Sequence, residues 1–137
     1  MIGNLFDGTT IPALEQVVAF TQARHNVLAG NVANMDTPGY RVRDLSPTAF
    51  QERLKEAITV GRSDESMSTR GEYTEDREAA MEEVRQSMHT LLYHDDSNDS
   101  LETQVNELNK NLGQHNLAIS ILRSQFALLQ TAISQRV

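Results

Sequence analysis

The last third of the chain carries a regular apolar pattern, which limits the fold more than any other feature. Between Leu101 and Ile133, apolar positions alternate at spacings of four and three residues, with one histidine among them. Side chains at this spacing share one face of a helix, which needs a second helix to cover it. The members of this C-terminal seam are Leu101, Val105, Leu108, Leu112, His115, Ile119, Leu122, Phe126, Leu129 and Ile133. We therefore expect one long helix that forms half of a coiled coil.

A second stripe, near the N-terminus, supplies the other half. Its members are Leu14, Val18, Thr21, His25, Leu28, Val32 and Met35, again with alternating spacing. This helix should begin at Pro12, because proline suits the first helical position. It should end near Asn34, because the residue before Pro38 leaves the helical region and Gly39 permits a tight turn.

Each stripe contains one histidine, His25 in the first and His115 in the second. A lone polar residue in such a stripe more often sets the register of the pair than catalyses a reaction. If the two helices run antiparallel, the histidines lie at similar heights, and we hypothesise that they are close together.

The segment between the two stripes has shorter helices and more loop. Ser46 suits an N-cap with Pro47 just inside a helix that should fade at Gly61. Residues 61–76 contain almost no apolar side chain, so we expect a mobile loop there. Residues 77–92 again show helical spacing of apolar side chains, which predicts a further helix.

The final helix should be capped by Asp99, with Glu102 three positions on. Beyond His115 it gains a second apolar flank, which calls for a second neighbour. This flank consists of Leu117, Ala118, Ile121, Ala127, Leu128 and Ala132. Residues 109–116 hold three Asn and one Gly, each of which weakens a helix by up to about 1 kcal/mol against Ala. We expect this stretch to depend on neighbours for its helical form.

Length and composition favour an all-α, elongated bundle in which the long terminal helices pair as a coiled coil. The 137 residues have room for about one domain, and 39% hydrophobic residues without Trp suit a helical rod. We assign an N-terminal axial helix and turn to residues 1–40 and an acidic middle segment to 41–98. Residues 99–137 form the coiled-coil helix, in one structural domain with 1–40.

Charge and motifs argue against several classes of function. The net charge of -7 leaves no basic face for nucleic acid, and the absence of Cys excludes thiol chemistry. No fingerprint of a hydrolase or nucleotide-binding loop occurs, so we predict no enzyme, no cofactor and no small-molecule substrate. No apolar run is longer than Phe126–Leu129, and the first residues lack a signal-peptide pattern, so we expect no membrane span and no cleaved signal.

The densest group of possible metal ligands lies between His89 and Asp96. Its two histidines, His89 and His94, are five residues apart and therefore do not share a helix face. The acidic residues that follow lack the spacing of a calcium-binding loop. A solvated helix end is the favoured interpretation, and a small metal-dependent hydrolase is kept as a rival.

The sequence from Arg24 to Asp44 strongly resembles the flagellar rod and hook family of bacterial axial proteins. The residues that carry this resemblance are Asn31, Ala33, Asn34, Thr37, Pro38, Gly39 and Tyr40. The Arg43-Asp44 pair, the short chain and the ending from Ser124 to Ile133 are similar to the proximal rod members of that family. The matched stretches lie at both ends of the chain.

The resemblance implies a structural subunit of the proximal rod, which polymerises through its terminal helices into a torque-transmitting shaft in the periplasm. It implies self-assembly, contacts with other proximal rod proteins and with the MS-ring/rod junction protein, and passage through the flagellar type III export apparatus. The residues expected at assembly interfaces are Leu14, Val18, Leu28, Val32, Leu112, Leu117, Ile119, Ile121, Leu122, Phe126, Leu128, Leu129 and Ile133. Of these, Leu117, Ile121 and Leu128 are expected to meet neighbouring subunits. Two alternatives stay open, a generic helical adaptor and another short flagellar axial protein.

Overall fold

The computed structural model describes residues 10–63, 73–88, 92–94 and 100–134. In this part the chain forms four α-helices and two short strands. The helices are α1 (Ile11–Asn34), α2 (Pro47–Ser63), α3 (Tyr73–Ser87) and α4 (Leu101–Ser134), and the strands are β1 (Arg43–Leu45) and β2 (Leu92–His94). The predicted all-α class with long terminal helices is confirmed.

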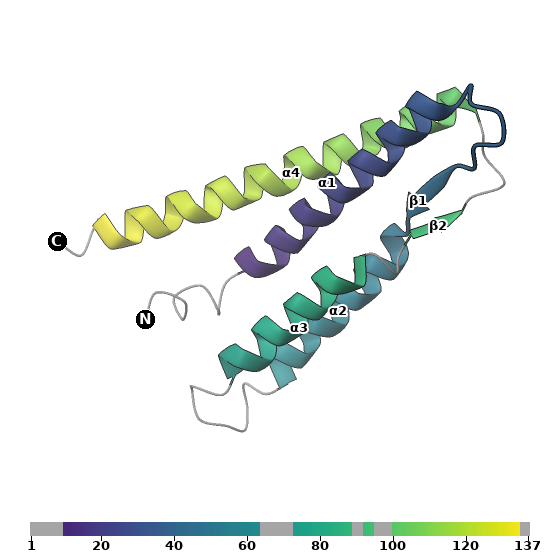
Figure 1. Ribbon diagram of the computed structural model, residues 1–137. Helices are drawn as coiled ribbons and strands as arrows, with labels where there is room; N and C mark the ends of the chain where they lie inside the picture. The colour runs from purple at the N-terminus through teal and green to yellow at the C-terminus, as the bar shows by residue number, and fades with distance from the viewer. Residues whose placement is uncertain (1–9, 64–72, 89–91, 95–99, 135–137) are drawn as a thin grey trace.

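The terminal helices α1 and α4 lie side by side and run antiparallel (Figure 1). Asn31, near the end of α1, contacts Gln104 near the start of α4, and Thr21 contacts His115 further along. Helix α4 has 34 residues and α1 has 24. Since the turn end of the pair is aligned, the C-terminal part of α4 extends past Ile11, where α1 begins.

Helix α1 ends in the tight turn that the sequence predicts. The backbone N–H of Thr37 donates to the carbonyl of Asn34 at 2.9 Å, and that of Tyr40 donates to the carbonyl of Thr37 at 3.1 Å. Gly39 has a φ of 78°, the left-handed conformation that glycine adopts without steric cost. The chain is thereby turned back along α1 and into β1.

Side-chain caps fix the starts of α2 and α4. Ser46 Oγ accepts a hydrogen bond from the backbone N–H of Ala49 at 3.3 Å, as expected for the N-cap of α2. At α4 the same role belongs to Ser100, whose Oγ accepts from the N–H of Thr103 at 3.3 Å. The predicted cap, Asp99, lies outside the described residues.

The two strands were not expected from the sequence. They pair antiparallel with Arg43 opposite His94 and Leu45 opposite Leu92. Each strand has three residues, which is too short for an alternating pattern to stand out. The pair brings the two ends of the middle segment together, with β1 beside α1 and β2 paired to β1 (Figure 1).

The helices of the middle segment differ from their predicted bounds. Helix α2 runs on to Ser63 and α3 already begins at Tyr73, so residues 61–63 and 73–76 are helical rather than part of a loop. The rest of that expected loop, 64–72, lies outside the described residues. Helix α3 ends at Ser87 instead of near residue 92, because the chain enters β2 at Leu92.

The hydrophobic core lies between α1 and the α2–α3 hairpin, not between α1 and α4. Phe20 of α1 stacks on Phe50 of α2, with ring centroids 4.1 Å apart and planes 8° apart. The other buried members of this cluster are Leu45, Ala57, Met81, Val84 and Met88. Ala13, Val17, Ala23 and Val27 of α1 pack against it. Helix α1 therefore gives an apolar face to the middle segment.

Helix α4 is the one helix in the described part with the length and mean hydropathy of a membrane-crossing segment. We predict no membrane span from the sequence, because the uninterrupted apolar runs of the chain are short. The mean hydropathy of α4 is nevertheless high, because an average tolerates scattered polar residues. One such helix is weak evidence, since core helices of other proteins pass the same test. Little of its most apolar stretch is buried, so α4 presents apolar side chains on the surface of the chain.

Candidate assembly interface

The face on which α1 and α4 meet is lined by hydrogen-bonding side chains. We call this set the polar seam, and it consists of Thr21, Arg24 and Asn31 of α1 with Gln104, Glu107, Asn111 and His115 of α4. Thr21, Arg24, Asn31, Gln104 and Asn111 are buried. Protein interiors rarely hold so many polar groups unless they are paired, and here nearly all of them are.

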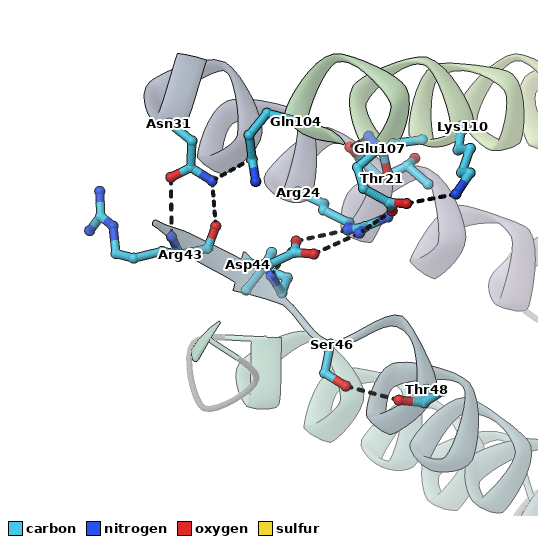
Figure 2. Close-up of polar contacts among 12 residues, drawn as sticks. Thr21, Arg24, Asn31, Arg43, Asp44, Ser46, Thr48, Gln104, Glu107 and Lys110 are labelled. Carbon is cyan, nitrogen blue, oxygen red and sulfur yellow. Dashed lines mark hydrogen bonds and ion pairs between the residues drawn. The ribbon is translucent and has the colours of Figure 1, made fainter. Parts of the chain in front are cut away.

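Arg24 is the centre of a buried ion cluster (Figure 2). Its Nε donates to Asp44 Oδ1 at 2.8 Å, and its Nη2 donates to Asp44 Oδ2 at 2.6 Å. The same Nη2 donates to Glu107 Oε2 at 2.9 Å. Burial lowers the pKa of Arg24, but the hydrogen bonds and charges of Asp44 and Glu107 outweigh burial and raise it overall. One cation thus joins α1, β1 and α4.

Glu107 is shared between two cations. Its second oxygen, Oε1, accepts from Lys110 Nζ at 2.8 Å, one helical turn further along α4. The hydrogen bond from Lys110 lowers the pKa of Glu107, burial opposes this shift, and Arg24 adds to it, so the pKa lies below its usual range. The carboxylate therefore stays charged at neutral pH and keeps Arg24 compensated on the α4 side.

Asn31 is fully buried and uses its whole side-chain amide. Its Nδ2 donates to the carbonyl of Arg43 at 2.6 Å and to Gln104 Oε1 at 3.0 Å. Its Oδ1 accepts from the backbone N–H of Arg43 at 3.2 Å and from the Tyr40 hydroxyl at 3.1 Å. Two donors and two acceptors are the full capacity of an amide, so this site leaves no polar atom of Asn31 unpaired. Figure 2 shows Asn31 between Gln104 and the strand.

Within the polar seam, Thr21 of α1 contacts two residues of α4. His115 Nδ1 lies 2.8 Å from Thr21 Oγ1, and Asn111 Nδ2 donates to the carbonyl of Thr21 at 2.7 Å. The hydroxyl of Thr21 also lies within 3.0 Å of the Val17 and Val18 carbonyls of its own helix. The polar partner of His115 on α1 is thus Thr21, one helical turn before His25, and the closeness of the two histidines stays a hypothesis.

Asn111 also explains why the weak stretch 109–116 is helical. Helix α4 is continuous through it, although Asn and Gly are poor helix formers. Asn111 and His115 contact α1, so tertiary contacts offset the low propensity. One acceptor, Asn111 Oδ1, is buried without a hydrogen-bond partner among the described residues.

The expected apolar seam on α4 is largely turned away from α1, although one of its members, His115, contacts Thr21. The contact face is turned by one position, so that Gln104 and Asn111 are buried where Val105 and Leu112 were expected, and the two apolar side chains are exposed. The physical reason lies on α1, which packs apolar side chains against α2 and α3 and presents the polar side chains of Thr21, Arg24 and Asn31 to α4. Ala118 is the one buried apolar residue of α4 in the described part.

The apolar side chains of α4 therefore point outward. The large exposed ones are Leu101, Val105, Leu112, Leu117, Ile121, Phe126, Leu128 and Ile133. Leu117 and Leu128 each expose 62% of their surface and Ile121 exposes 38%. Scattered exposed apolar residues are common, but eight on one helix exceed that and indicate a surface for protein contacts.

The remaining residues expected at assembly interfaces have different surroundings. Ile119, Leu122 and Leu129 are half-buried on α4, and Leu14, Val18 and Val32 are half-buried on α1. Leu28 exposes only 1% and lies inside the subunit, so it cannot meet another chain in this fold. The expectation for Leu28 is therefore corrected from assembly contact to internal packing.

The polar seam was missed by the sequence analysis, although a signal exists. Thr21, Arg24, Leu28 and Asn31 follow a spacing of three, four and three, and Gln104, Glu107, Asn111 and His115 follow three, four and four. Polar residues at the same spacing as an apolar stripe mark a second possible contact face. Of the seam residues, only Thr21, Asn31 and His115 had been singled out.

The candidate metal ligands of the middle segment are only partly described. His89, Asp95, Asp96 and Asp99 lie outside the described residues, and His94 belongs to β2. Within the described ranges, no three His, Asp or Glu side chains are grouped as a metal ion would need.

The fold and these contacts define a helical subunit whose polar seam is paired within the chain, except for Asn111 Oδ1, and whose long α4 helix exposes apolar side chains, as an assembly component does. The family described as flagella basal body rod protein matches residues 19–41, which run from α1 through the Asn31–Tyr40 turn. The predicted resemblance to the flagellar rod family is confirmed. Two curated relatives are flagellar basal body rod proteins FlgB, and this chain is similar to them over its matched stretch.

The first of these relatives, from Aquifex aeolicus, is 48% identical over 42 residues, which cover 31% of this chain and 32% of the relative. The second, from Salmonella typhimurium, is 44% identical over 41 residues, which cover 30% of this chain and 28% of the relative. The match thus spans less than a third of the length of the curated relatives. No solved structure matches the chain significantly.

Proposed function

We propose that this chain is a structural subunit of the proximal rod of the bacterial flagellar basal body, without catalytic activity. It polymerises through its terminal helices to form part of the torque-transmitting shaft. The observation that carries the proposal is the arrangement of α4, which meets α1 through the polar seam and exposes its apolar residues. A subunit built in this way is stable as a helix pair and still has apolar surface for neighbours.

The sequence match supports the same function. It covers the helix end and turn that contain Asn31, Gly39 and Tyr40, and the two relatives are named as rod proteins. In this chain that element positions β1 and therefore the middle segment against α1. The acidic middle segment accordingly lies on one side of α1, with α4 on another (Figure 1).

The proposal extends to partners and location. We assign contacts with other copies, with other proximal rod proteins and with the MS-ring/rod junction protein, in the periplasmic part of the basal body. Export through the flagellar type III apparatus without a cleaved signal peptide belongs to the same proposal. Mass spectrometry of the chain in purified basal bodies tests the last point, because an intact N-terminus is expected and a shortened one would contradict it.

The main test places charges on the exposed apolar surface. In a Leu117→Asp, Leu128→Asp variant, each carboxylate would have to be buried unpaired in a subunit contact, which is strongly unfavourable. We expect unchanged helical circular dichroism of the free chain, no completed rods by electron microscopy, and loss of motility in a strain that depends on this chain. The matched control is Gln114→Asp, Gln130→Asp, which adds the same charge at exposed polar positions of α4.

The phenotype of the Leu117, Leu128 variant and the oligomeric state of the unmodified protein separate the proposal from its rivals. Motile cells with complete rods in the Leu117, Leu128 variant would overturn the assembly role of this surface. Discrete dimers of the unmodified protein at high concentration, with no filaments or stacks, would favour a helical adaptor. Deleting residues 124–137 and scoring rod completion together with motility tests the same surface on a larger scale.

A further inference from the structure

The apolar stripe of α4 cannot by itself define where its partner helix sits. Its members repeat with alternating spacing over the whole helix, so a slide of one heptad again places apolar side chains on apolar side chains. Any second copy of the chain offers the same stripe. In a crowded assembly of identical helices, apolar burial alone would permit several registers and several partners.

The Arg24 contact does not tolerate such a slide. A shift of α4 by one heptad brings Gln114 or Ser100 to the place of Glu107. Neither residue carries a charge, so the buried cluster of Arg24 would lose its α4 partner. Arg24 would keep Asp44 but lose one of its two carboxylate partners, so a shifted register weakens the buried cluster without leaving Arg24 uncompensated.

The contact between Thr21 and His115 also depends on the register of α4. A shift by one heptad brings Leu122 or Leu108 to the place of His115. Thr21 Oγ1 would then face an apolar side chain, although it now lies 2.8 Å from His115 Nδ1. A wrong register therefore loses a specific contact at two points along α1, Arg24 and Thr21. At Asn31 the slide brings Asn111 or Ser97 to the place of Gln104, and both carry an oxygen acceptor, so this position does not discriminate.

We propose that the polar seam is the specificity determinant of helix pairing in this protein. It fixes the register of α4 on α1 and reserves this face of α4 for an α1 helix rather than for another α4, which leaves the exposed apolar residues of α4 for other contacts. Buried polar pairs add little net stability compared with apolar packing, but they penalise every arrangement in which they are unpaired. The polar seam therefore disfavours wrong helix pairings more than it adds to the stability of the correct one.

The test replaces all four seam residues of α4 by leucine. This filled-seam variant, Q104L/E107L/N111L/H115L, keeps Arg24 paired with Asp44 and removes the unpaired acceptor Asn111 Oδ1. The matched control, N106L/N109L/Q114L/N116L, adds four leucines to the same helix at exposed positions. Both sets are measured in the full-length chain.

Register is read from the distance between two spin labels. The chain has no Cys, so Gln22→Cys and Gln130→Cys, both at exposed positions, give unambiguous labelling sites. We expect one distance in the parent and in the control. In the filled-seam variant we expect additional distances, displaced by about 10 Å for each heptad of slide. Chains labelled only at Gln22→Cys are also mixed with chains labelled only at Gln130→Cys. We expect dipolar coupling between labels on different chains in the filled-seam variant and none in the parent.

A single unchanged distance in the filled-seam variant, with no signal between chains, would overturn the inference. If that variant loses its helical circular dichroism, the N111L/H115L variant takes its place, with N109L/N116L as control and the same two expected results. The measurement uses unassembled chains, so it does not rest on the proposed function. Loss of rods with an unchanged register would count against the seam and not against the rod assignment.

Discussion

The side-chain amide of Asn31 binds the backbone of Arg43 through both of its polar atoms. Its Nδ2 donates to the Arg43 carbonyl at 2.6 Å, and its Oδ1 accepts from the Arg43 N–H at 3.2 Å. These are the two groups that a neighbouring strand would pair. One asparagine of α1 therefore holds β1 against the helix, and the Tyr40 hydroxyl holds Asn31 in turn.

The first prediction follows from this contact. Asn31→Ala leaves the Arg43 N–H, the Arg43 carbonyl and Gln104 Oε1 without their buried partner. We expect the free energy of unfolding to fall by about 3 kcal/mol or more, since three groups lose their partner and each unsatisfied buried group costs about 1–3 kcal/mol. Urea unfolding followed by circular dichroism measures it. Asn26→Ala, at an exposed position of α1, is the control, and an equal loss in both variants would contradict the assignment.

Arg24 gives the second prediction. Arg24→Met removes the cation and leaves Asp44, whose side chain is only 13% exposed, uncompensated. We expect a loss of about 3 kcal/mol in urea unfolding, in the range for breaking a buried pair on one side. Arg85→Met removes an exposed pair with Glu82 and should cost less than about 1 kcal/mol. Adding Asp44→Asn to Arg24→Met should recover part of the loss, and no recovery would exclude charge burial as its cause.

The third prediction concerns pH. The pKa of Glu107 is lower in the folded chain than in the unfolded chain, where it is about 4.3. Its contribution to stability is therefore present above pH 4.3 and is lost as the pH falls through the lowered folded value. Between pH 7 and acid pH, Glu107→Gln should lose less stability than the parent chain. Glu83→Gln, at an exposed position, should follow the parent, and identical pH profiles for all three chains would refute the prediction.

Two glycines should respond in opposite directions to alanine. A Cβ at Gly113 would meet no atom within 4 Å, so Gly113→Ala should stabilise α4 by up to about 1 kcal/mol. A Cβ at Gly39 also has space, but the φ of 78° is unfavourable for alanine, so Gly39→Ala should cost about 1–2 kcal/mol. Thermal unfolding of both variants measures the difference. Shifts of the same sign would show that the two backbone conformations are assigned wrongly.

Two phenylalanines should affect different properties, Phe20 the stability of the free chain and Phe126 its assembly. Phe20→Ala removes a buried ring stacked on Phe50 and should cost about 3–5 kcal/mol in urea unfolding. Phe126 is 47% exposed, so Phe126→Ala should change the stability of the free chain much less. It should, however, reduce the formation of filaments or complete rods seen by electron microscopy. Normal assembly with Phe126→Ala would remove this residue from the interface.

The sequence was sufficient for the features that depend on local chemistry. The end of α1, the positive φ of Gly39 and the Ser46 cap were predicted because each depends on residues within a few positions of one another. The pairing of the two terminal helices was also predicted from their matching stripes, whereas its antiparallel direction entered only as a condition for the histidine hypothesis. Local signals thus defined the elements and their order.

The contact faces could not be predicted in the same way. Counting apolar positions assigns the stripe of α4 to α1, but it cannot show that Phe20 and Val17 of α1 already pack against α2 and α3. That competition depends on residues far apart in the chain. Asp44 is an example, because its role became visible only when β1 placed it 2.6 Å from Arg24. The strands were missed because three residues are too few to show an alternating pattern.

The unequal lengths of α1 and α4 have a further consequence. At one end of the pair the two helices finish together at the Asn31–Tyr40 turn, whereas at the other end α4 continues past Ile11 with Phe126, Leu128 and Ile133 exposed. The two ends of the subunit therefore differ: both helices stop at one end, and apolar side chains of α4 are exposed at the other. A filament in which such subunits repeat in one orientation is directional, because its two tips are chemically different and incoming chains meet a different surface at each tip.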